Sequence, residues 1–305
     1  MTATAAEIER AAALIRQGGL VAFPTETVYG LGANALDANA VKRIYQAKER
    51  PWASPLIVHV SDEQMARSIA ADWPPLAQKL AARFWPGPVT LVVKKAGIVP
   101  DVVTAGLDTV GLRAPSHPVA LELIRRAGVP IAAPSANRFG QISPTRPEHV
   151  RAGLGNRLDM ILDGGATQVG IESTVVSLNR EPPVILRPGM ISQADLEAAT
   201  GVRWEREVEL PRVQESPGQS ARHYAPKTAF YLLEPGAAQP PGRGRVLEMP
   251  SNAAAFAAQL YAKLHEADAQ GWDWIAIEKP PETVEWAGIL DRLRRATAPP
   301  SGSSS

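Results

Sequence analysis

The sequence predicts a mixed α/β fold in two unequal parts, a large N-terminal domain followed by a small open α/β domain. Short apolar runs alternate with amphipathic helical segments through residues 1–202, and a shorter alternation of the same kind occupies residues 229–297. Between them, residues 203–228 are polar, include Pro211 and Pro217 and lack sustained periodicity. With 305 residues and 45% hydrophobic content, the chain is long enough to bury two unequal cores.

The first element is a helix that begins with a capping box at Thr4 and Glu7 and ends before Gly18 and Gly19. Capping boxes at 61–64 and 145–148 predict two further helix starts, and Ser192 with Asp195 begins the last helix of this part. The apolar runs predict buried strands at residues 20–23, 56–60, 89–93, 130–133 and 184–186.

The second part repeats the alternation on a smaller scale. The pattern predicts strands at 229–233 and 274–277 and helices at 252–269 and 283–295. We therefore expect a catalytic domain at 1–202, a linker or hinge loop at 203–228, a small α/β domain at 229–297 and a disordered tail at 298–305, which is rich in proline and serine.

Composition excludes several classes of function. The 32 basic and 31 acidic residues nearly cancel, so bulk charge does not favour nucleic acid as an obligatory partner, although a local basic surface remains open. No run of about 18 apolar residues or signal peptide is present, which predicts a cytoplasmic protein with no membrane contact. The absence of cysteine excludes disulfides, thiolate catalysis and cysteine-type zinc sites, and we expect no metal site built by the protein.

The common nucleotide and hydrolase motifs are absent. No lysine follows the glycines near Gly30 and Gly32 as a P-loop requires, and the third glycine of a dinucleotide fingerprint is missing. There is no Gly-x-Ser-x-Gly elbow and no His-Glu-x-x-His helix. These absences disfavour covalent catalysis by serine and hydrolysis by zinc.

Polar loops follow the predicted strands, where open α/β sheets place their ligand contacts. Residues 24–30 offer hydroxyls and a carboxylate, and Ser135 with Asn137 offers further polar groups. Lys48 and Arg50 lie just beyond a helix, where they either satisfy terminal carbonyls or clamp a phosphate.

Three further polar residues lie within or at the end of apolar runs. Arg113 and Arg187 each end such a run, where a cation needs an anionic partner or water, so a structural ion pair remains an alternative. His59 lies among apolar residues, a setting more typical of a hydrogen-bonded core histidine than of a ligand.

Several of these segments together resemble the YrdC family of threonylcarbamoyl-AMP synthases. The resemblance spans residues 24–189 and rests on Pro-Thr-Glu-Thr-Val-Tyr-Gly at 24–30, Lys48-x-Arg50, Arg113, Pro-Ser-Ala-Asn at 134–137, Glu-Ser-Thr at 172–174 and Arg-Pro-Gly at 187–189. Residues 216–226 are similar to the hinge of the longer, two-domain form. The resemblance implies a YrdC-like mixed twisted sheet with flanking helices, joined to a small Rossmann-like domain.

The resemblance also implies an activity. Enzymes of this family join L-threonine, bicarbonate and ATP, with Mg²⁺, into threonylcarbamoyl-adenylate and pyrophosphate. A separate complex then uses the adenylate to modify tRNA beside the anticodon. By the same resemblance, Lys48 and Arg50 are the expected catalytic residues. Relatives often carry asparagine at position 54, so Ser54 has a shorter reach.

The family's binding residues carry over to two groups in this sequence. The group expected to bind threonine is Thr27, His59, Arg113, the backbone of Ala133, and Ser173. The group expected to bind ATP is Lys48, Arg50, Ser54, Thr109, Ser135, Asn137, Ser143, Arg187 and, closing over it from the hinge, Tyr224.

Two alternatives belong to other functional classes. The first is an RNA-binding module without synthase activity, since YrdC-like domains present a concave basic surface; a weak contact with tRNA would also fit an active synthase. The second is a carbamoyl-transferring domain of hydrogenase maturation, which normally lies in a longer protein with acylphosphatase and zinc-finger segments. The presence of Lys48, Arg50, Ser135 and Asn137 together favours the synthase.

Overall fold

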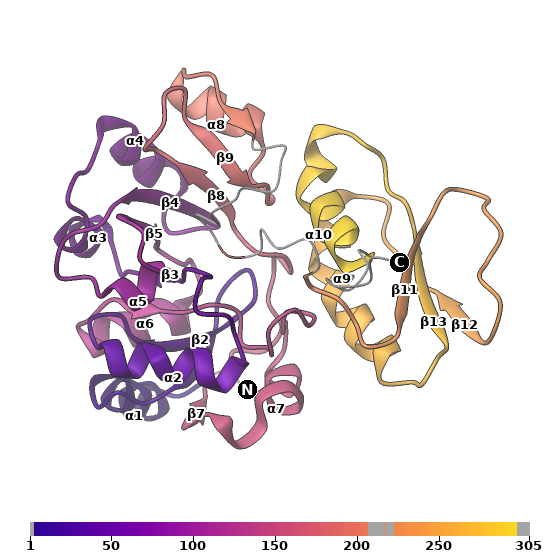
Figure 1. Ribbon diagram of the computed structural model, residues 1–305, viewed down its shortest axis with the longest axis horizontal. Coiled ribbons are helices and arrows are strands. Elements are labelled where there is room, and N and C mark those ends of the chain that lie inside the picture. Colours follow the sequence, from indigo (N-terminus) through magenta and orange to yellow (C-terminus); the bar gives the residue numbers. More distant parts are fainter. Residues whose placement is uncertain (1–2, 207–216, 218–222, 298–305) are drawn as a thin grey trace.

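The computed structural model describes residues 3–206, 217 and 223–297, and it arranges them in a large and a small α/β domain (Figure 1). The large domain is built on a ten-stranded mixed sheet with the order β10-β9-β8-β4-β5-β3-β6-β2-β1-β7. Its strands are β1 (Val21–Pro24), β2 (Tyr29–Asn34), β3 (Ile57–His59), β4 (Val89–Lys94), β5 (Thr109–Arg113), β6 (Ile131–Ala132), β7 (Met160–Ile161), β8 (Thr174–Ser177), β9 (Val184–Arg187) and β10 (Glu205–Arg206).

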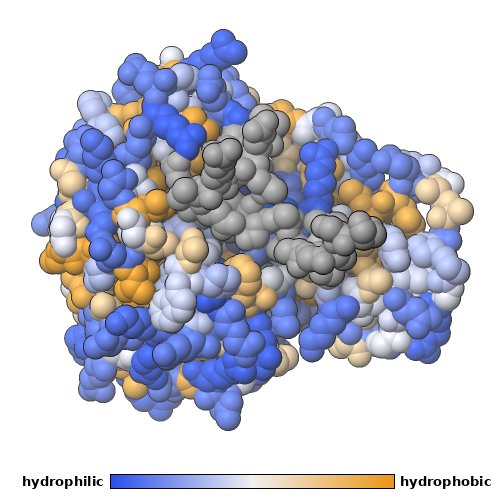
Figure 2. Space-filling view, viewed as in Figure 1, coloured by the Kyte–Doolittle hydropathy of each residue, from blue (hydrophilic) through white to orange (hydrophobic). Residues whose placement is uncertain are grey.

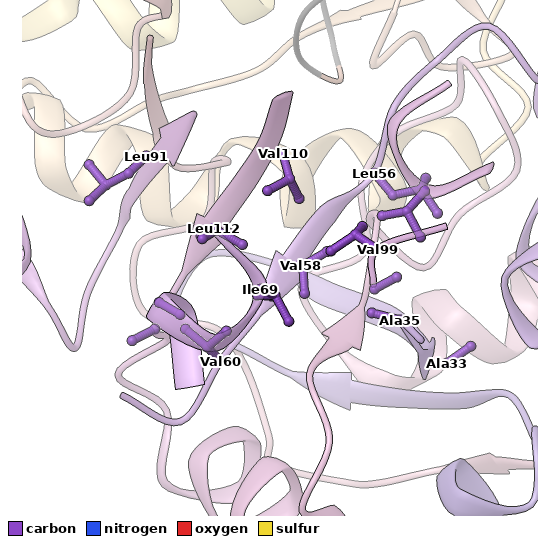
Figure 3. Close-up of a cluster of buried hydrophobic side chains, with 14 of the residues drawn as sticks. Ala33, Ala35, Leu56, Val58, Val60, Ile69, Leu91, Val99, Val110 and Leu112 are labelled. Atoms are coloured by element: carbon purple, nitrogen blue, oxygen red, sulfur yellow. The ribbon is translucent and has the colours of Figure 1, made fainter. Parts of the chain in front are cut away.

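Helices flank this sheet on both faces. They are α1 (Ala5–Arg16), α2 (Ala38–Lys48), α3 (Glu63–Ile69), α4 (Pro75–Phe84), α5 (Asp101–Thr104), α6 (Pro118–Ala127), α7 (Pro147–Leu154), the short 3₁₀ helix η1 (Gly155–Arg157) and α8 (Gln193–Thr200). Alternate side chains of β1 point to opposite faces of the sheet, as the two-residue period of a strand requires. Val21 and Phe23 pack with α1 and α6, whereas Ala22 belongs to the main core with α2, α3 and α4. Figure 3 shows part of this main core, with Val58 of β3, Val110 and Leu112 of β5, and Val99 among its side chains.

The small domain holds a three-stranded parallel sheet in the order β11-β13-β12. Its elements are β11 (Ala229–Leu233), β12 (Gly244–Val246), α9 (Ala253–Asp268), β13 (Trp274–Glu278), the 3₁₀ helix η2 (Val284–Trp286) and α10 (Ala287–Thr297). In Figure 1 the two helices of this domain lie on the side that faces the large domain. The predicted fold class, a mixed sheet with flanking helices and a second small α/β domain, is confirmed.

The structure differs from the sequence expectations at several element ends. The N-cap of α3 is Asp62, one residue after the predicted Ser61, because its carboxylate accepts from the Met65 N–H. The capping box predicted at 145–148 is wrong, since α7 starts after Arg146 with no side-chain cap and the Thr145 N–H donates to His149 instead.

The boundary between the two domains also differs in detail from the sequence pattern. Trp204 is buried in the main core and β10 pairs in parallel with β9, so the large sheet extends into the stretch predicted as a linker. The remainder of the predicted hinge at 207–216 and 218–222 lies outside the described residues, as does the predicted tail at 298–305. The domain limits given by the sequence stay predictions.

The visible surface is mixed in character. Figure 2 shows hydrophobic residues scattered among hydrophilic ones over both domains, outside the grey atoms. Within the part of the chain that the structure describes, no helix combines the length and apolarity needed to cross a membrane.

Candidate active site

A cavity lies where several strand ends and loops of the large domain meet the segment that leads into the small one. Its walls come from the β1–β2 turn, the loop after α2, β3, the end of β5, the segment after β6, the approach to β8 and the end of β9. The lining residues are Thr25, Thr27, Val28, Gly30, Arg50, Ile57, His59, Arg113, Ala133, Pro134, Ser135, Glu172, Ser173, Arg187, Pro217, His223 and Tyr224.

The β1–β2 turn is held in shape by one hydroxyl. Thr25 Oγ1 donates to the Val28 carbonyl at 2.6 Å and accepts from the N–H groups of Thr27 and Val28, each at 3.2 Å. Such a side-chain turn is a common use of threonine in loops. It leaves the Thr27 side chain, which is fully buried, on the wall of the cavity beside Thr25.

Strand register brings His59 and Arg113 together. β3 and β5 are parallel, and their pairing places His59 directly opposite Arg113 at the end of both strands. Burial, with a contribution from the Arg113 charge, holds the pKa of His59 well below its ordinary value, so the imidazole is neutral. Its Nδ1 has no hydrogen-bond partner among the described residues, which leaves it available to a ligand.

Arg113 is a buried cation with a carboxylate neighbour that the sequence analysis did not assign. Its Nη2 lies 2.7 Å from Glu26 Oε1 in an ion pair, and its Nε donates to the Gly87 carbonyl at 3.3 Å. Glu26 also accepts from the Ser116 N–H at 3.0 Å. Among the described residues, the second terminal nitrogen of the guanidinium, Nη1, has no hydrogen-bond partner, which leaves it available to an anionic ligand at the cavity wall.

Two more members of the predicted threonine group complete this part of the cavity. Ser173 Oγ is within 2.8 Å of Thr90 Oγ1 and accepts from Arg187 Nη2 at 3.1 Å. The Ala133 N–H is already bonded to the Ile57 carbonyl at 2.9 Å, so Ala133 offers a ligand its carbonyl oxygen. All five residues of the predicted threonine group thus line one cavity.

The predicted ATP group is divided between the cavity wall and the layer behind it. Arg50, Ser135, Arg187 and Tyr224 line the cavity. Lys48 lies behind, with its ammonium donating to the carbonyls of Ser135 and Asn137. The hydroxyls of Ser54 and Ser143 are bonded to Arg50 Nη2 and Glu172 Oε1, each at 2.5 Å, while Thr109 and Asn137 line two other, separate cavities.

Three buried cations lie at or behind this wall with no carboxylate in ion-pair contact among the described residues: Lys48, Arg50 and Arg187. Burial lowers the pKa of all three, that of Lys48 well below its ordinary value and that of Arg50 to about 10. The Arg50 charge lowers the pKa of Lys48 further. Buried cations that depress one another's pKa are stabilised by an anion placed between them.

The hinge contributes two aromatic residues to the cavity. Burial lowers the pKa of His223 to about 3, so its imidazole is neutral, and its ring packs edge-on against Phe139 and Tyr224. The hydroxyl of Tyr224 is buried without a hydrogen-bond partner among the described residues. Tyr224 also has a positive φ of 62°, an uncommon conformation for a residue other than glycine.

Sequence reasoning missed several residues of the wall. Glu26 and Glu172 lie inside the quoted motifs, but nothing in the sequence showed that they would be the partners of arginines. A signal was present for Glu26 alone, because a carboxylate in a loop after a buried strand is a natural partner for a buried cation. His223 stood in the hinge motif without an assigned role.

The described residues contain no group of three or more His, Cys, Asp or Glu side chains that could hold a metal ion. The two carboxylates of the cavity, Glu26 and Glu172, are already paired with arginines. These residues do not fit a protein-built magnesium cage, so any magnesium would be held by nucleotide phosphates and water.

Comparison with protein families matches nearly the whole chain. The Sua5/YciO/YrdC family model, which carries the description "Telomere recombination", matches residues 13–189. A second model, for the C-terminal domain of threonylcarbamoyl-AMP synthase, matches residues 191–298.

Curated relatives and solved structures agree with these matches. A threonylcarbamoyl-AMP synthase of Pyrococcus abyssi is 49% identical over 231 residues, covering 75% of this chain and 68% of the relative. One of Bacillus subtilis is 41% identical over 320 residues, covering 95% and 92%. The crystal structure of P. abyssi Sua5 complexed with L-threonine superposes with a TM-score of 0.89 at 39% identity, covering 95% of this chain and 94% of that one.

Proposed function

The chain belongs to the Sua5/YciO/YrdC family, and from that premise we propose that it is a threonylcarbamoyl-AMP synthase whose cavity holds L-threonine beside ATP. It is an enzyme that transfers AMP from ATP. The relatives that cover nearly the full length of the chain are synthases, which favours this activity over an RNA-binding module.

The observation that carries the proposal is the placement of two kinds of anion-binding group in one buried site. Arg113 keeps one terminal nitrogen, Nη1, without a hydrogen-bond partner among the described residues, and it lies among small polar groups suited to an amino-acid carboxylate. Lys48, Arg50 and Arg187 lie at or just behind the same wall without carboxylate partners among the described residues, as a triphosphate requires. An amino acid and a nucleotide bound this way would present the amine toward the α-phosphate.

Each member of the threonine group has a specific role in the proposal. Arg113 binds the carboxylate, while the Ala133 carbonyl and the neutral His59 ring orient the amine. The hydroxyls of Thr27 and Ser173 orient the threonine side chain. In the ATP group, Lys48 and Arg50 offset charge on the phosphates as pyrophosphate leaves.

The chemistry follows from this placement and needs no covalent bond to the protein. The threonine amine adds to the carbon of carbon dioxide and loses a proton, or adds to bicarbonate with loss of water, and either route forms a carbamate. A carbamate oxygen then attacks the α-phosphorus of ATP and the bond to pyrophosphate breaks. Holding the reactants together supplies much of the rate, since proximity is worth up to about 7–11 kcal/mol.

The wider setting forms part of the same proposal. Mg²⁺ arrives bound to ATP, bicarbonate supplies the carbonyl group, and the adenylate passes to the complex that modifies tRNA. We place the reaction in the cytoplasm. The supporting observation is the family membership.

The test is an omission assay. Purified protein is given threonine, bicarbonate and Mg-ATP, and pyrophosphate is measured with each component left out in turn. Release that requires both threonine and bicarbonate is expected, and serine in place of threonine should give less. Release that is indifferent to threonine would show an ATP pyrophosphohydrolase instead and contradict the proposal.

A further inference from the structure

Helix α10 of the small domain places one arginine against the outside of the active-site wall. Arg292 has no exposed surface, and its guanidinium donates to Glu172 Oε2 at 2.8 Å, to the Glu172 carbonyl at 3.2 Å and to the Pro188 carbonyl at 2.9 Å. All three acceptors belong to the large domain. Its fourth strong bond goes to Asp291 on its own helix.

Glu172 is the main acceptor in the contact between Arg292 and the large domain. Its Oε1 accepts from Ser143 Oγ at 2.5 Å, and its Oε2 accepts from the Tyr261 hydroxyl at 3.1 Å as well as from Arg292. Burial alone would raise the pKa of this carboxyl, but the charges of Arg292 and Arg187 bring it below the ordinary value. Glu172 is therefore a carboxylate with hydrogen bonds on both oxygens.

The two segments that Arg292 holds each carry a residue of the proposed substrate site. Glu172 precedes Ser173, in the threonine group, and Pro188 follows Arg187, in the ATP group. Arg187 itself donates to the Ser173 carbonyl from Nε at 3.2 Å and from Nη2 at 3.1 Å. Ser173 and Arg187 are thus bonded to each other at the cavity wall. Their chain neighbours Glu172 and Pro188 are bonded to Arg292, which does not line the cavity.

The backbones of the two domains are in close contact at two glycines near the ion pair between Arg292 and Glu172. A Cβ atom on Gly288, one turn before Arg292, would lie 2.7 Å from the Gly189 carbonyl oxygen. A Cβ on Gly170 would lie 2.2 Å from the Ala257 carbonyl oxygen. With such close contacts the guanidinium has little freedom to move relative to Glu172.

We propose that Arg292 is a positioning residue for the synthase site, holding Ser173 and Arg187 in place through Glu172 and Pro188. The inference rests on the proposed function. Arg292 does not line the cavity, and it acts only through the two segments that it bonds. The small domain therefore helps to fix the positions of active-site residues through Arg292 of α10.

The experiment compares two arginines of the same helix. Arg292→Met removes the guanidinium that bonds Glu172 and Pro188. Arg294→Met is the matched control, because Arg294 has 61% of its side chain exposed and pairs with Glu282 on the surface. KM for threonine, KM for ATP and kcat are measured by pyrophosphate release, the threonine Kd by calorimetry, and folding by thermal denaturation.

For Arg292→Met we expect both KM values and the threonine Kd to rise by roughly tenfold or more, since three hydrogen bonds from a charged group are lost. Arg294→Met should match the unaltered protein. Arg292→Lys should fall between them, because one ammonium retains the charge but cannot reproduce the planar fork. A purely structural role would lower the denaturation midpoint and leave the KM values of the folded fraction unchanged.

A gentler change keeps the proposal testable if Arg292→Met does not fold. Tyr261→Phe removes one hydroxyl from Glu172 and leaves Arg292 intact, and a rise of a few-fold in both KM values is expected. The inference is overturned if every folded variant of Arg292 and Tyr261 has the KM values of Arg294→Met. An inactive unaltered protein is a different result, which overturns the proposed function and this inference with it.

Discussion

Lys48, the last residue of α2, is an ammonium buried to 1% exposure whose partners among the described residues are two backbone carbonyls. Carbonyls stabilise a cation less than a carboxylate does, and Arg50 adds a like charge nearby. Both effects disfavour the charged form. A residue kept in this state at a cavity wall is suited to meet an anion that arrives with the substrate.

The lowered pKa of Lys48 predicts that ATP binding is linked to the uptake of a proton. The pKa of Lys48 is lowered in the free protein, and a triphosphate placed beside it would raise that pKa again. Between these two pKa values ATP binding takes up a proton, so ATP affinity should fall as pH rises through that window. Calorimetry in buffers of different ionisation enthalpy measures the uptake, at pH values above about 7.5, where a terminal phosphate with a pKa of about 6 is already almost fully ionised.

The matched pair for this measurement lies on one helix. Lys48→Met should abolish the proton uptake and weaken ATP binding, whereas Lys42→Met, an exposed position of α2, should change neither. If Lys48→Met retains the proton uptake, the proton binds to another group. Lys48 would then only satisfy terminal carbonyls at the helix end.

At the residue level, the sequence predicted the types of group in the site better than their partners. Arg113 and Arg187 stood out because a cation at the end of an apolar run needs a partner, and Lys48 and Arg50 because they lie together just beyond a helix. Glu26 was recognisable as a candidate partner for a cation, but that it pairs with Arg113, and Glu172 with Arg292, could not be foreseen. Those pairs depend on how strands and domains pack, and Glu172 and Arg292 are 120 residues apart.

The elements of the large domain position the site through strand register and tight turns. The parallel pairing of β3 and β5 aligns His59 with Arg113, and the β1–β2 turn presents Thr27. Short apolar runs predicted five of the ten strands of the large sheet, namely β1, β3, β4, β6 and β9. β2 was harder, because Tyr29 and Gly30 follow a threonine-rich segment that resembles a loop, although they pair with the neighbouring strand β1 across a tight turn.

A glycine before Glu172 provides a prediction at this scale. Gly170 has a φ of +81°, and a Cβ there would lie 2.2 Å from the Ala257 carbonyl oxygen of α9. Gly170→Ala should therefore cost the left-handed strain of about 1–2 kcal/mol and a further ~1–3 kcal/mol for displacing packed backbone. Urea denaturation measures the sum.

Gly165→Ala is the control that isolates the free-energy cost of the left-handed backbone strain. Its φ is +74°, yet nothing lies within 4 Å of the added Cβ. We expect Gly165→Ala to show the strain alone and to keep full activity. Equal losses of stability in the two variants would mean that the domains separate easily at this contact.

Considered as a whole molecule, the chain joins its two domains through a shared core. Val28, Ile142 and Ile171 of the large domain are buried in the same cluster as Phe256 and Leu290 of the small one. The sequence predicted two α/β units because each has its own alternation of strands and helices. It could not predict that the small unit packs behind the active site, since that depends on contacts between segments distant in sequence.

In the proposed function, this cavity joins threonine, a one-carbon unit and AMP. The direct test supplies isotopically labelled bicarbonate with threonine and Mg-ATP and examines the product by mass spectrometry immediately after mixing. The predicted result is a single adenylate that contains threonine and the labelled carbon. A threonine adenylate without the label, or AMP with no adenylate at any time, would contradict it.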